Sequence, residues 1–326
     1  MLAASLGRYQ KLQKLFLLKD RAKSVKVHGA MVVRDVLSAL CEKMGDVNVE
    51  EYGLYIYTRT NIAGSLLRNE DYVLDLTTIL DEKRIEYRLY FKKLLWYSKH
   101  DFTNNVYNNM VYDQICSDFL SGNLLTAADV DETYAHNDLP RLVCLQHLAT
   151  NPQPALKSML QNLNKYIPHT IMGVLLDDEW ADLLGELWLE LQDSSPADAR
   201  REFLEMVSKL EMYGSRFFEL NNVSDRRING PAVLAVNKSG ITFLHTETRT
   251  SLLKYSFSEV VSIRRLASQS SGKHFFDLKL GNLMVQRTTR CETRQSSEIT
   301  AVVSWYIQAE QQRTSGTQGN STGNLF

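Results

Sequence analysis

Cys291 is the side chain whose neighbours look most like those of a catalytic nucleophile, because Arg290 precedes it and Arg294 follows it. A cysteine phosphatase needs such cations to hold an anionic substrate, but it also needs a glycine-rich loop that cradles the phosphate. No such loop surrounds Cys291, and the chain has no Gly-x-Ser-x-Gly elbow for a serine nucleophile. The sequence therefore predicts no covalent catalysis.

The spacing of residues in this sequence does not match that of a phosphate-binding loop or of a metal site. The stretch "SSGK" at 270–273 would need glycine where Ala267 stands and Ser or Thr where His274 stands to be a Walker loop. The seven histidines are scattered, with no pair three or four residues apart and no cysteine neighbours. A structural zinc site needs four close-set nitrogen or sulfur ligands. We expect no metal and no cofactor.

Three adjacent carboxylates, Asp177, Asp178 and Glu179, are the remaining candidates for acid–base chemistry. They stand at the expected start of a helix, where acidic side chains interact favourably with the helix dipole. This structural interpretation is the simpler one. We therefore expect no catalytic residues and no enzyme.

Composition is typical of a folded cytosolic protein. The chain has 326 residues, 44% hydrophobic and 23% charged residues, and a formal net charge of −1, so it has no overall attraction to nucleic acid. Its length suggests two or three domains. The four cysteines lie far apart and are expected to be reduced, and neither a signal peptide nor a membrane span is recognisable. Cytoplasmic localisation is the expectation.

Residues 13–96 alternate between strand and helix patterns. "KLFLLKD" and "KSVKVHG" are two short strand candidates, and "YGLYIYT" and "EYRLYFKKLLW" follow after a helix. One face of that helix carries Val33, Val36, Leu37, Leu40 and Met44. The order of strand, strand, helix, strand, short strand and strand predicts a ubiquitin-like β-grasp.

Residues 97–213 have a helical period throughout. Trp180, Leu183, Leu184, Leu187 and Leu191 form a regular apolar stripe. The pair Ser195-Pro196 predicts the start of the last helix, with serine as N-cap and proline at the first helical position. The segment is predicted to be a helical bundle.

Residues 214–312 carry seven short strands separated by turns and then one helix from about 296 to 312. This pattern fits a pleckstrin- or phosphotyrosine-binding-like (PH/PTB-like) sandwich with a C-terminal helix. Residues 313–326 are polar and are predicted to be a disordered tail.

The three segments in this order resemble a FERM module, which implies an α+β fold of three lobes in a cloverleaf. "FLEMVSKLEMYGSRFFEL" resembles the helix-to-strand junction in FERM domains of unconventional myosin tails, and "IPHTIMGVLLDDEW" is similar to a stretch of their helical lobe. "AVNKSGITFL", "LGNL" and "CETRQSSEITAVVSWYI" resemble their third lobe. The resemblance covers roughly residues 9 to 312, includes myosins of class VII and class XV, and implies an acyl-CoA-binding-protein-like helical lobe.

That resemblance implies a cargo- and partner-binding function at the end of an actin-based motor, with association to the cytoskeleton in actin-rich protrusions. The implied partners are cytoplasmic tails of adhesion receptors and segments of scaffold proteins, bound in the third lobe or in clefts between lobes. The chain departs from the family pattern because no myosin-tail-homology domain precedes the FERM segment and no actin-binding tail of the ezrin type follows it. We expect any site shared with the former to be incomplete, and no self-inhibition within the chain.

The third lobe is the best candidate for a peptide-binding groove. In a PTB-like sandwich, an extended peptide can add to the edge strand that faces the C-terminal helix. That strand is expected to be Val260–Leu266, where consecutive Arg264 and Arg265 point to opposite faces, so that at most one reaches the groove. Both arginines also fit a simple role in preventing edge aggregation. The expected groove residues are Val261, Ile263, Arg264, Arg265, Leu266, Val302, Trp305 and Ala309. Trp305 alternatively packs against a neighbouring loop.

Tyr213 and Gly214 alone separate the last helix of the second segment from the first strand of the third. A junction this short predicts a fixed relation between lobes, with Phe217 and Phe218 burying on opposite faces of the strand and at least one at the lobe interface.

Three alternatives remain open. Basic pairs at 92–93, 200–201 and 226–227 allow a phosphoinositide-dependent membrane adaptor, although we expect these pairs to be mostly solvated surface. The C-terminal Leu325-Phe326 could serve as a ligand for a carboxylate-capturing domain, with Asn324 departing from the usual signature. Docking onto a motor domain outside this chain is the third.

Overall fold

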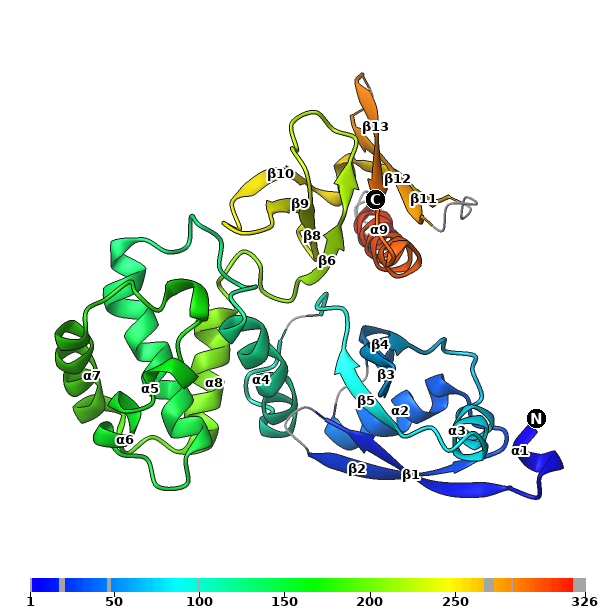
Figure 1. Ribbon diagram of the computed structural model, residues 1–326, viewed down its shortest axis with the longest axis horizontal. Coiled ribbons are helices and arrows are strands. Elements are labelled where there is room, and N and C mark those ends of the chain that lie inside the picture. Colours follow the sequence, from blue (N-terminus) through cyan, green and yellow to red (C-terminus); the bar gives the residue numbers. More distant parts are fainter. Residues whose placement is uncertain are drawn as a thin grey trace, which may run out of the picture. The chain divides into compact units, whose positions relative to one another are not determined.

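The computed structural model describes residues 2–17, 21–45, 48–98, 100–266, 273–282 and 284–318. The chain divides into two compact units (Figure 1). Unit 1 comprises Met1–Ser121 and His136–Ser208, and unit 2 comprises Gly122–Ala135 and Lys209–Phe326.

Unit 1 begins with a ubiquitin-like lobe built on a five-stranded sheet of order β2-β1-β5-β3-β4. Helices α2 and α3 cover one face of this sheet, and the buried face of α2 contains the five apolar residues expected from the sequence. The elements of the lobe are α1 (Leu2–Ser5), β1 (Gln10–Phe16), β2 (Ala22–His28), α2 (Val33–Met44), a 3-10 turn (Val49–Glu51), β3 (Tyr52–Thr58), β4 (Asn61–Leu66), α3 (Val73–Glu82) and β5 (Tyr87–Lys93).

Two details of this lobe differ from the prediction. Helix α3 was not expected, because its apolar positions follow a turn-rich stretch and its start at Tyr72 has no side-chain cap. The first strand lies at Gln10–Phe16 and not at 14–20, because its register with β2 places buried Leu15 opposite Lys23 and brings exposed Leu12 into the strand. Tertiary pairing therefore overrides the local apolar run. Residues 18–20 lie outside the described part of the chain.

A helical lobe completes unit 1, as predicted. Ser195 caps the last helix, since its side-chain oxygen accepts a hydrogen bond from the backbone N–H of Asp198 at 3.1 Å. The ring of Phe203 packs edge-on against Tyr112 and Phe119, and all three are almost fully buried. The elements are α4 (Asn105–Leu120), a π-helical turn (Tyr134–Asp138), α5 (Leu139–Thr150), α6 (Leu156–Leu160), 3-10 turns (Leu163–Lys165 and His169–Ile171), α7 (Asp177–Leu191) and α8 (Pro196–Val207).

Polar contacts at the end of β5 join the two lobes of unit 1. The Gln114 side chain of α4 binds the Lys93 backbone twice, accepting from its N–H at 3.2 Å and donating to its carbonyl at 2.7 Å. Lys93 in turn places its ammonium nitrogen 2.6 Å from a carboxylate oxygen of Glu51, and both side chains are almost completely buried. Rings of Tyr52 and Tyr107 lie within about 5 Å of that nitrogen. A buried, paired cation thus connects a strand of one lobe to a helix of the next.

Unit 2 contains two four-stranded sheets, of order β10-β9-β8-β6 and β11-β12-β13-β7, and a long C-terminal helix. The expected order of short strands followed by one helix is confirmed, although the described residues form eight strands and not seven, because the two-residue strand β7 was not predicted. The elements are β6 (Arg216–Leu220), β7 (Asn222–Val223), β8 (Ala232–Asn237), β9 (Gly240–His245), β10 (Ser251–Tyr255), a 3-10 turn (Phe257–Glu259), β11 (Val260–Arg265), β12 (Phe275–Gly281), β13 (Gln286–Glu292) and α9 (Ser296–Gln318). Helix α9 continues past the expected boundary at 312 into the predicted tail, and residues 319–326 lie outside the described part.

The junction before β6 is longer than the two residues predicted from the sequence, because α8 already ends at Val207 and turns occupy most of residues 208–215 before β6 begins at Arg216. This junction is tied to the β8 strand of unit 2. Gly214 has a φ of +68°, which favours glycine, and completes the turn after Tyr213. The Asn237 side chain of β8 donates to the Glu211 carbonyl and to the Ser215 hydroxyl, both at 2.9 Å. This network holds the entry into the strand within unit 2.

The two phenylalanines of β6 pack within unit 2 in different surroundings. Phe217 packs on a cluster that includes Met212 and Val233, whereas Phe218 is 1% exposed. Adjacent strand residues point to opposite faces, so this difference follows from the pleat. The expected role of Phe217 or Phe218 at an interface between lobes stays a prediction.

None of the helices in the described part of the chain is both long enough and apolar enough to cross a membrane.

Candidate peptide-binding groove

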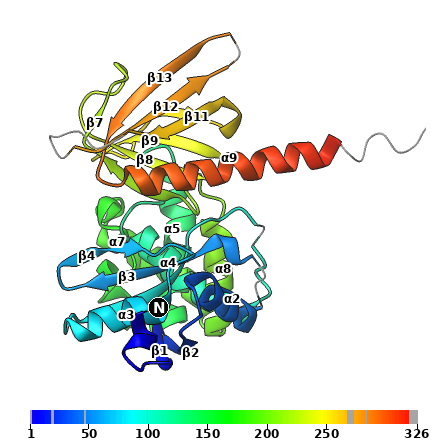
Figure 2. The same ribbon diagram turned by 90° about the vertical axis from the view of Figure 1, so that its right-hand side faces the viewer.

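Strand β11 is the outermost strand of its sheet, as the sequence predicted for Val260–Leu266. Among the strands that the structure describes, it pairs with β12 alone, and its Val261 side chain is 43% exposed. Helix α9 packs against β11 and β12 and runs alongside their sheet (Figure 2). The arrangement places an open strand edge next to a helix, which is the geometry needed for peptide addition.

The hydrogen-bond pattern shows which backbone groups of β11 face outward. Leu266 donates its N–H to the Phe275 carbonyl at 3.0 Å, so this pair is hydrogen-bonded. In an antiparallel ladder, hydrogen-bonded and non-hydrogen-bonded pairs alternate. Arg264 therefore bonds toward β12, whereas the N–H and C=O groups of Ile263 and Arg265 point away from it. These outward groups are the ones that an added strand would use.

The helix side of the site has a buried core and a half-buried flank. Tyr306 is 1% exposed and stacks on Phe257 with ring centroids 5.2 Å apart, which anchors α9 to the strand end. Trp305 and Ala309 are half-buried beside this core, and the Trp305 ring meets Tyr306 edge-on at 5.3 Å. Val302, by contrast, is only 5% exposed and belongs to the core. Trp305 and Ala309 thus remain candidates for the apolar wall of the groove, whereas Val302 is part of the core on which that wall rests.

The two arginines of β11 lie on opposite faces. Arg264 pairs with Asp277 on the outer face, with 3.6 Å between guanidinium and carboxylate, and Arg290 reaches the same carboxylate at 2.8 Å. These contacts, the Arg290 hydrogen bond above all, lower the pKa of Asp277. Arg265 stands opposite buried Phe276, on the face turned toward the core. Of the two, Arg265 is therefore the better placed for a groove ligand.

The residues that raised the question of catalysis have structural roles. Cys291 is 0% exposed, and burial raises the pKa of its thiol to about 12, so a thiolate does not form near neutral pH. Glu179 accepts a hydrogen bond from the Leu176 backbone N–H at 2.7 Å and so caps α7. Among the described residues, no group of three or more His, Cys, Asp or Glu side chains is arranged to hold a metal ion.

The basic pairs are more engaged than the sequence suggested. Lys93 is buried against Glu51, and Arg200 binds the Asn109 side chain and the Ala149 carbonyl. The expectation that these pairs are mostly solvated surface is therefore wrong for Lys93 and incomplete for Arg200, because sequence shows the charge and not its partner.

Arg227, from the third basic pair, is bound to a buried carboxylate. Its guanidinium donates to both oxygens of Asp225, at 3.0 and 2.7 Å, and also to the Tyr255 hydroxyl. These bonds are the main reason why the pKa of Asp225 falls to about 2, with Arg287 adding to the effect from 3.6 Å. Arg227 is therefore committed to a structural ion pair.

We expect Asp225→Asn to destabilise unit 2 in a pH-dependent way. A carboxylate with a lowered folded-state pKa contributes fully above its unfolded pKa of about 4 and loses that contribution as the pH falls toward about 2. Urea unfolding at several pH values should therefore show a wild-type advantage near pH 6 that shrinks steadily below pH 4. An advantage that does not change with pH would contradict this origin. Asp198→Asn, at the exposed start of α8, is the matched control.

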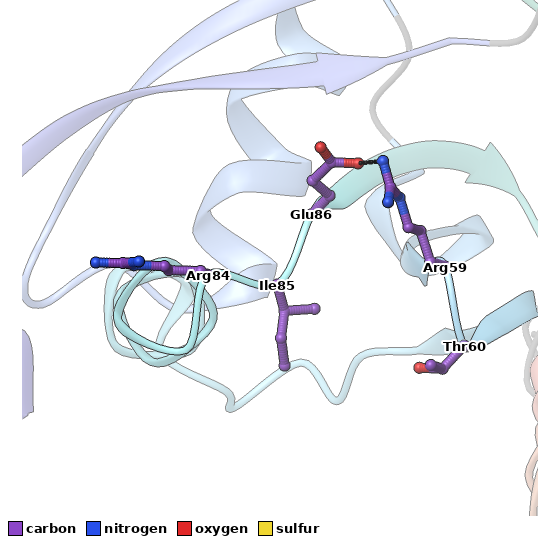
Figure 3. A pocket seen from close by; sticks show the side chains of 5 residues that line it. All are labelled: Arg59, Thr60, Arg84, Ile85 and Glu86. Carbon is purple, nitrogen blue, oxygen red and sulfur yellow. Dashed lines mark ion pairs between the residues drawn. The ribbon is translucent and has the colours of Figure 1, made fainter.

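Two of the pockets formed by the described residues lie in unit 1. One, of about 550 Å³, is lined by Leu156, Lys157, Leu160 and Gln161 along α6. The other, of about 290 Å³, lies between the β3–β4 turn and the loop after α3 (Figure 3). In it, Arg59 pairs with Glu86 at 2.8 Å, while Arg84 points away from both. The second pocket therefore does not bring its two guanidinium groups together on one anion.

Three family models match the chain in succession. An RA-like domain matches residues 11–95, the FERM central domain matches residues 98–218, and a PTB domain of the IRS-1 type matches residues 219–311. These ranges follow the ubiquitin-like lobe, the helical lobe and the sandwich. Together with the fold, they define the chain as a FERM module.

The chain is also similar to individual proteins and to solved structures that contain FERM domains. Human unconventional myosin-XV is 27% identical over 93% of this chain and 9% of its own length, and mouse unconventional myosin-VIIb is 22% identical over 90% and 14%. The C-terminal MyTH4-FERM domain of human myosin 7b, solved with the harmonin-a PDZ3 domain, has a TM-score of 0.74 at 19% identity, over 94% of this chain and 62% of that one. The FERM structure of Drosophila Merlin has a TM-score of 0.65 at 13% identity, over 94% and 98%.

The chain is a FERM domain of the unconventional-myosin-tail type. It spans about a tenth of the length of the curated relatives described above. FERM domains of such tails are protein-interaction modules, and the similarity associates this chain with the cytoskeleton.

Proposed function

We propose that this module binds cargo and partner proteins for an actin-based motor, without catalysing a reaction. The observation that supports this proposal is the open edge of β11 beside α9, where the backbone N–H and C=O groups of Ile263 and Arg265 point outward. Adhesion-receptor tails and scaffold-protein segments are the proposed ligands, bound as an added strand in the groove of unit 2. Clefts between lobes are the second proposed kind of site.

Affinity and specificity in this groove would come from different groups. Main-chain hydrogen bonds to Ile263 and Arg265 would hold any extended segment, whatever its sequence. The half-buried Trp305 would then select for an apolar side chain, because aromatic anchors in a packed site contribute most to binding energy. Arg265 would favour a carboxylate or phosphate at the adjacent peptide position.

Replacing Trp305 with alanine should weaken peptide binding roughly tenfold or more, because the apolar wall is lost. Fluorescence anisotropy with labelled peptides from adhesion-receptor cytoplasmic tails measures the affinity. Gln308→Ala, at an exposed position of the same helix, is the matched control and should bind as wild type does. Wild-type affinity in Trp305→Ala would remove the groove assignment.

A second variant tests the backbone contribution separately. Ile263→Pro removes an N–H that points away from β12, so the ladder within the sheet is preserved while the bond to an added strand is lost. We expect weaker peptide binding and a lower unfolding midpoint, because proline also loses the packing of the half-buried Ile263 side chain opposite Leu278. Ile263→Val retains the N–H and a branched side chain and serves as its control.

The harmonin complex of the myosin 7b domain suggests a PDZ domain as a second probe. Two sites could receive it on this chain: the groove of unit 2, or the C-terminal Asn324 to Phe326, which lies outside the described residues. Deleting residues 324–326 distinguishes these sites, because only a carboxylate-capturing contact would be lost.

The alternative is a membrane adaptor that reads phosphoinositides. Co-sedimentation with vesicles that contain or lack phosphatidylinositol bisphosphate tests it directly. Strong phosphoinositide-dependent sedimentation without peptide binding would favour the adaptor.

Docking onto a motor domain is the third proposal. Mixing this module with an isolated myosin motor while following ATPase activity tests it.

A further inference from the structure

The outer face of the ubiquitin-like sheet gathers cations and aromatic rings from four strands. Helices α2 and α3 cover the opposite face, and the strand registers place Lys14 and Phe16 of β1, Lys26 of β2, Tyr57 of β3, and Tyr90 and Lys92 of β5 on this outer side. We call these six residues, together with Arg88 of β5, the basic–aromatic face.

The rings of this face form a continuous layer. The centroids of Phe16 and Tyr90 are 5.6 Å apart, and those of Tyr90 and Tyr57 are 5.0 Å apart. Gly64 of β4, with a φ of +76°, closes the layer, because a Cβ there would lie 2.6 Å from the Tyr57 ring. Aromatic pairs and this glycine contact hold the layer in one conformation.

The cations are held in place over these rings. The Lys14 ammonium lies 4.9 Å from the Phe16 centroid, and the Arg88 guanidinium lies 5.1 Å from it. Lys92 lies 5.1 Å from the Tyr57 centroid and donates to the Tyr57 hydroxyl at 2.7 Å. Positive charge is therefore positioned in advance, which lowers the entropic cost of binding an anion.

Charge on the face is strongly one-sided. At the outward positions of the described strands, registers place four cations, Lys14, Lys26, Arg88 and Lys92, and no carboxylate. This occurs in a chain whose net charge is −1. Asp118 of α4 interacts electrostatically with Lys92, although burial raises the pKa of its carboxyl to about 7, so the inference rests on Lys14 and Lys26. Leu12, opposite Lys26, is 69% exposed and adds an apolar contact.

We infer that the basic–aromatic face is a second docking surface, whose occupant is an acidic protein segment that carries an apolar residue for Leu12. Charge complementarity identifies the carboxylates, and the fixed positions of the cations favour groups at defined spacing. Nucleic-acid bases fit less well, because cations already lie over the rings on which bases would stack. A lipid surface fits less well, because the ammonium groups of Lys14 and Lys92 are held against the sheet.

The test uses the complete chain and a fluorescein-labelled peptide of alternating glutamate and leucine. Lys14→Glu with Lys26→Glu should weaken binding roughly tenfold or more, and wild-type binding should fall at high salt. The control is Lys43→Glu with Lys83→Glu, which makes the same charge change at exposed positions of the two helices that cover the opposite face. It should bind within about twofold of wild type. Circular dichroism establishes that both variants are folded.

Several results would overturn the inference. Absence of peptide binding by the wild type, or equal losses in the two double variants, would show that the face is not a specific site. Capture by phosphatidylserine vesicles or by oligouridine, without peptide binding, would assign the face to a membrane or to RNA instead. Trp305→Ala should leave this binding unchanged, so failure here is distinguishable from failure of the groove.

Discussion

Replacing Lys93 with methionine is expected to destabilise unit 1 by about 3–5 kcal/mol, because it leaves the buried carboxylate of Glu51 without its cation. Glu51 and Lys93 are 3% and 2% exposed at their side chains, and their charged atoms lie 2.6 Å apart. Methionine fills most of the space of the lysine stem, so the loss reports the unpaired charge and not a cavity. Urea unfolding followed by circular dichroism measures the change.

Two further variants make this prediction specific. Glu51→Gln combined with Lys93→Met removes both charges, while the glutamine oxygen still accepts from the Ser98 N–H, so most of the lost stability should return. Arg34→Ala removes an exposed partner of Glu50 in the same lobe and should cost about 0.5 kcal/mol or less. A double variant as unstable as Lys93→Met alone would show that packing, and not charge, dominates.

Replacing Tyr306 with alanine is expected to destabilise unit 2 by about 3–5 kcal/mol and to release α9 from the sheet. Tyr306 is 1% exposed and stacks on Phe257, the first residue of the 3-10 turn that leads into the edge strand β11. Losing this ring removes an aromatic contact between α9 and the turn that leads into β11. Hydrogen exchange should show reduced protection of α9 and β11 before the rest of unit 2 is affected.

Tyr306 and its neighbour Trp305 should therefore separate stability from binding. Trp305→Ala is expected to reduce peptide affinity with a smaller change in the unfolding transition, because its ring is only half-buried. Tyr306→Ala is expected to lose both. Gln308→Ala controls for general effects on the helix. Equal stability losses at positions 305 and 306 would show that Trp305 belongs to the core.

The sequence by itself was sufficient for the order and type of most elements. The apolar stripe of α2, the Ser195 cap of α8 and the short strands of unit 2 are local patterns, set by side-chain period and by turn residues. The edge strand Val260–Arg265 was also predictable, since its position in a PTB-like sandwich follows from strand order. Helix α3 was missed because it has no side-chain cap at its start.

The chemical environment of individual side chains was decided only by the tertiary structure. Lys92 and Lys93 are neighbours in sequence, yet the pleat sends one to the outer face and buries the other against Glu51. Likewise, the basic–aromatic face joins residues from strands that are far apart in the chain. No linear pattern of basic and aromatic residues therefore predicts it. Charge and period are local properties of a sequence, whereas burial and partners arise from contacts between distant segments.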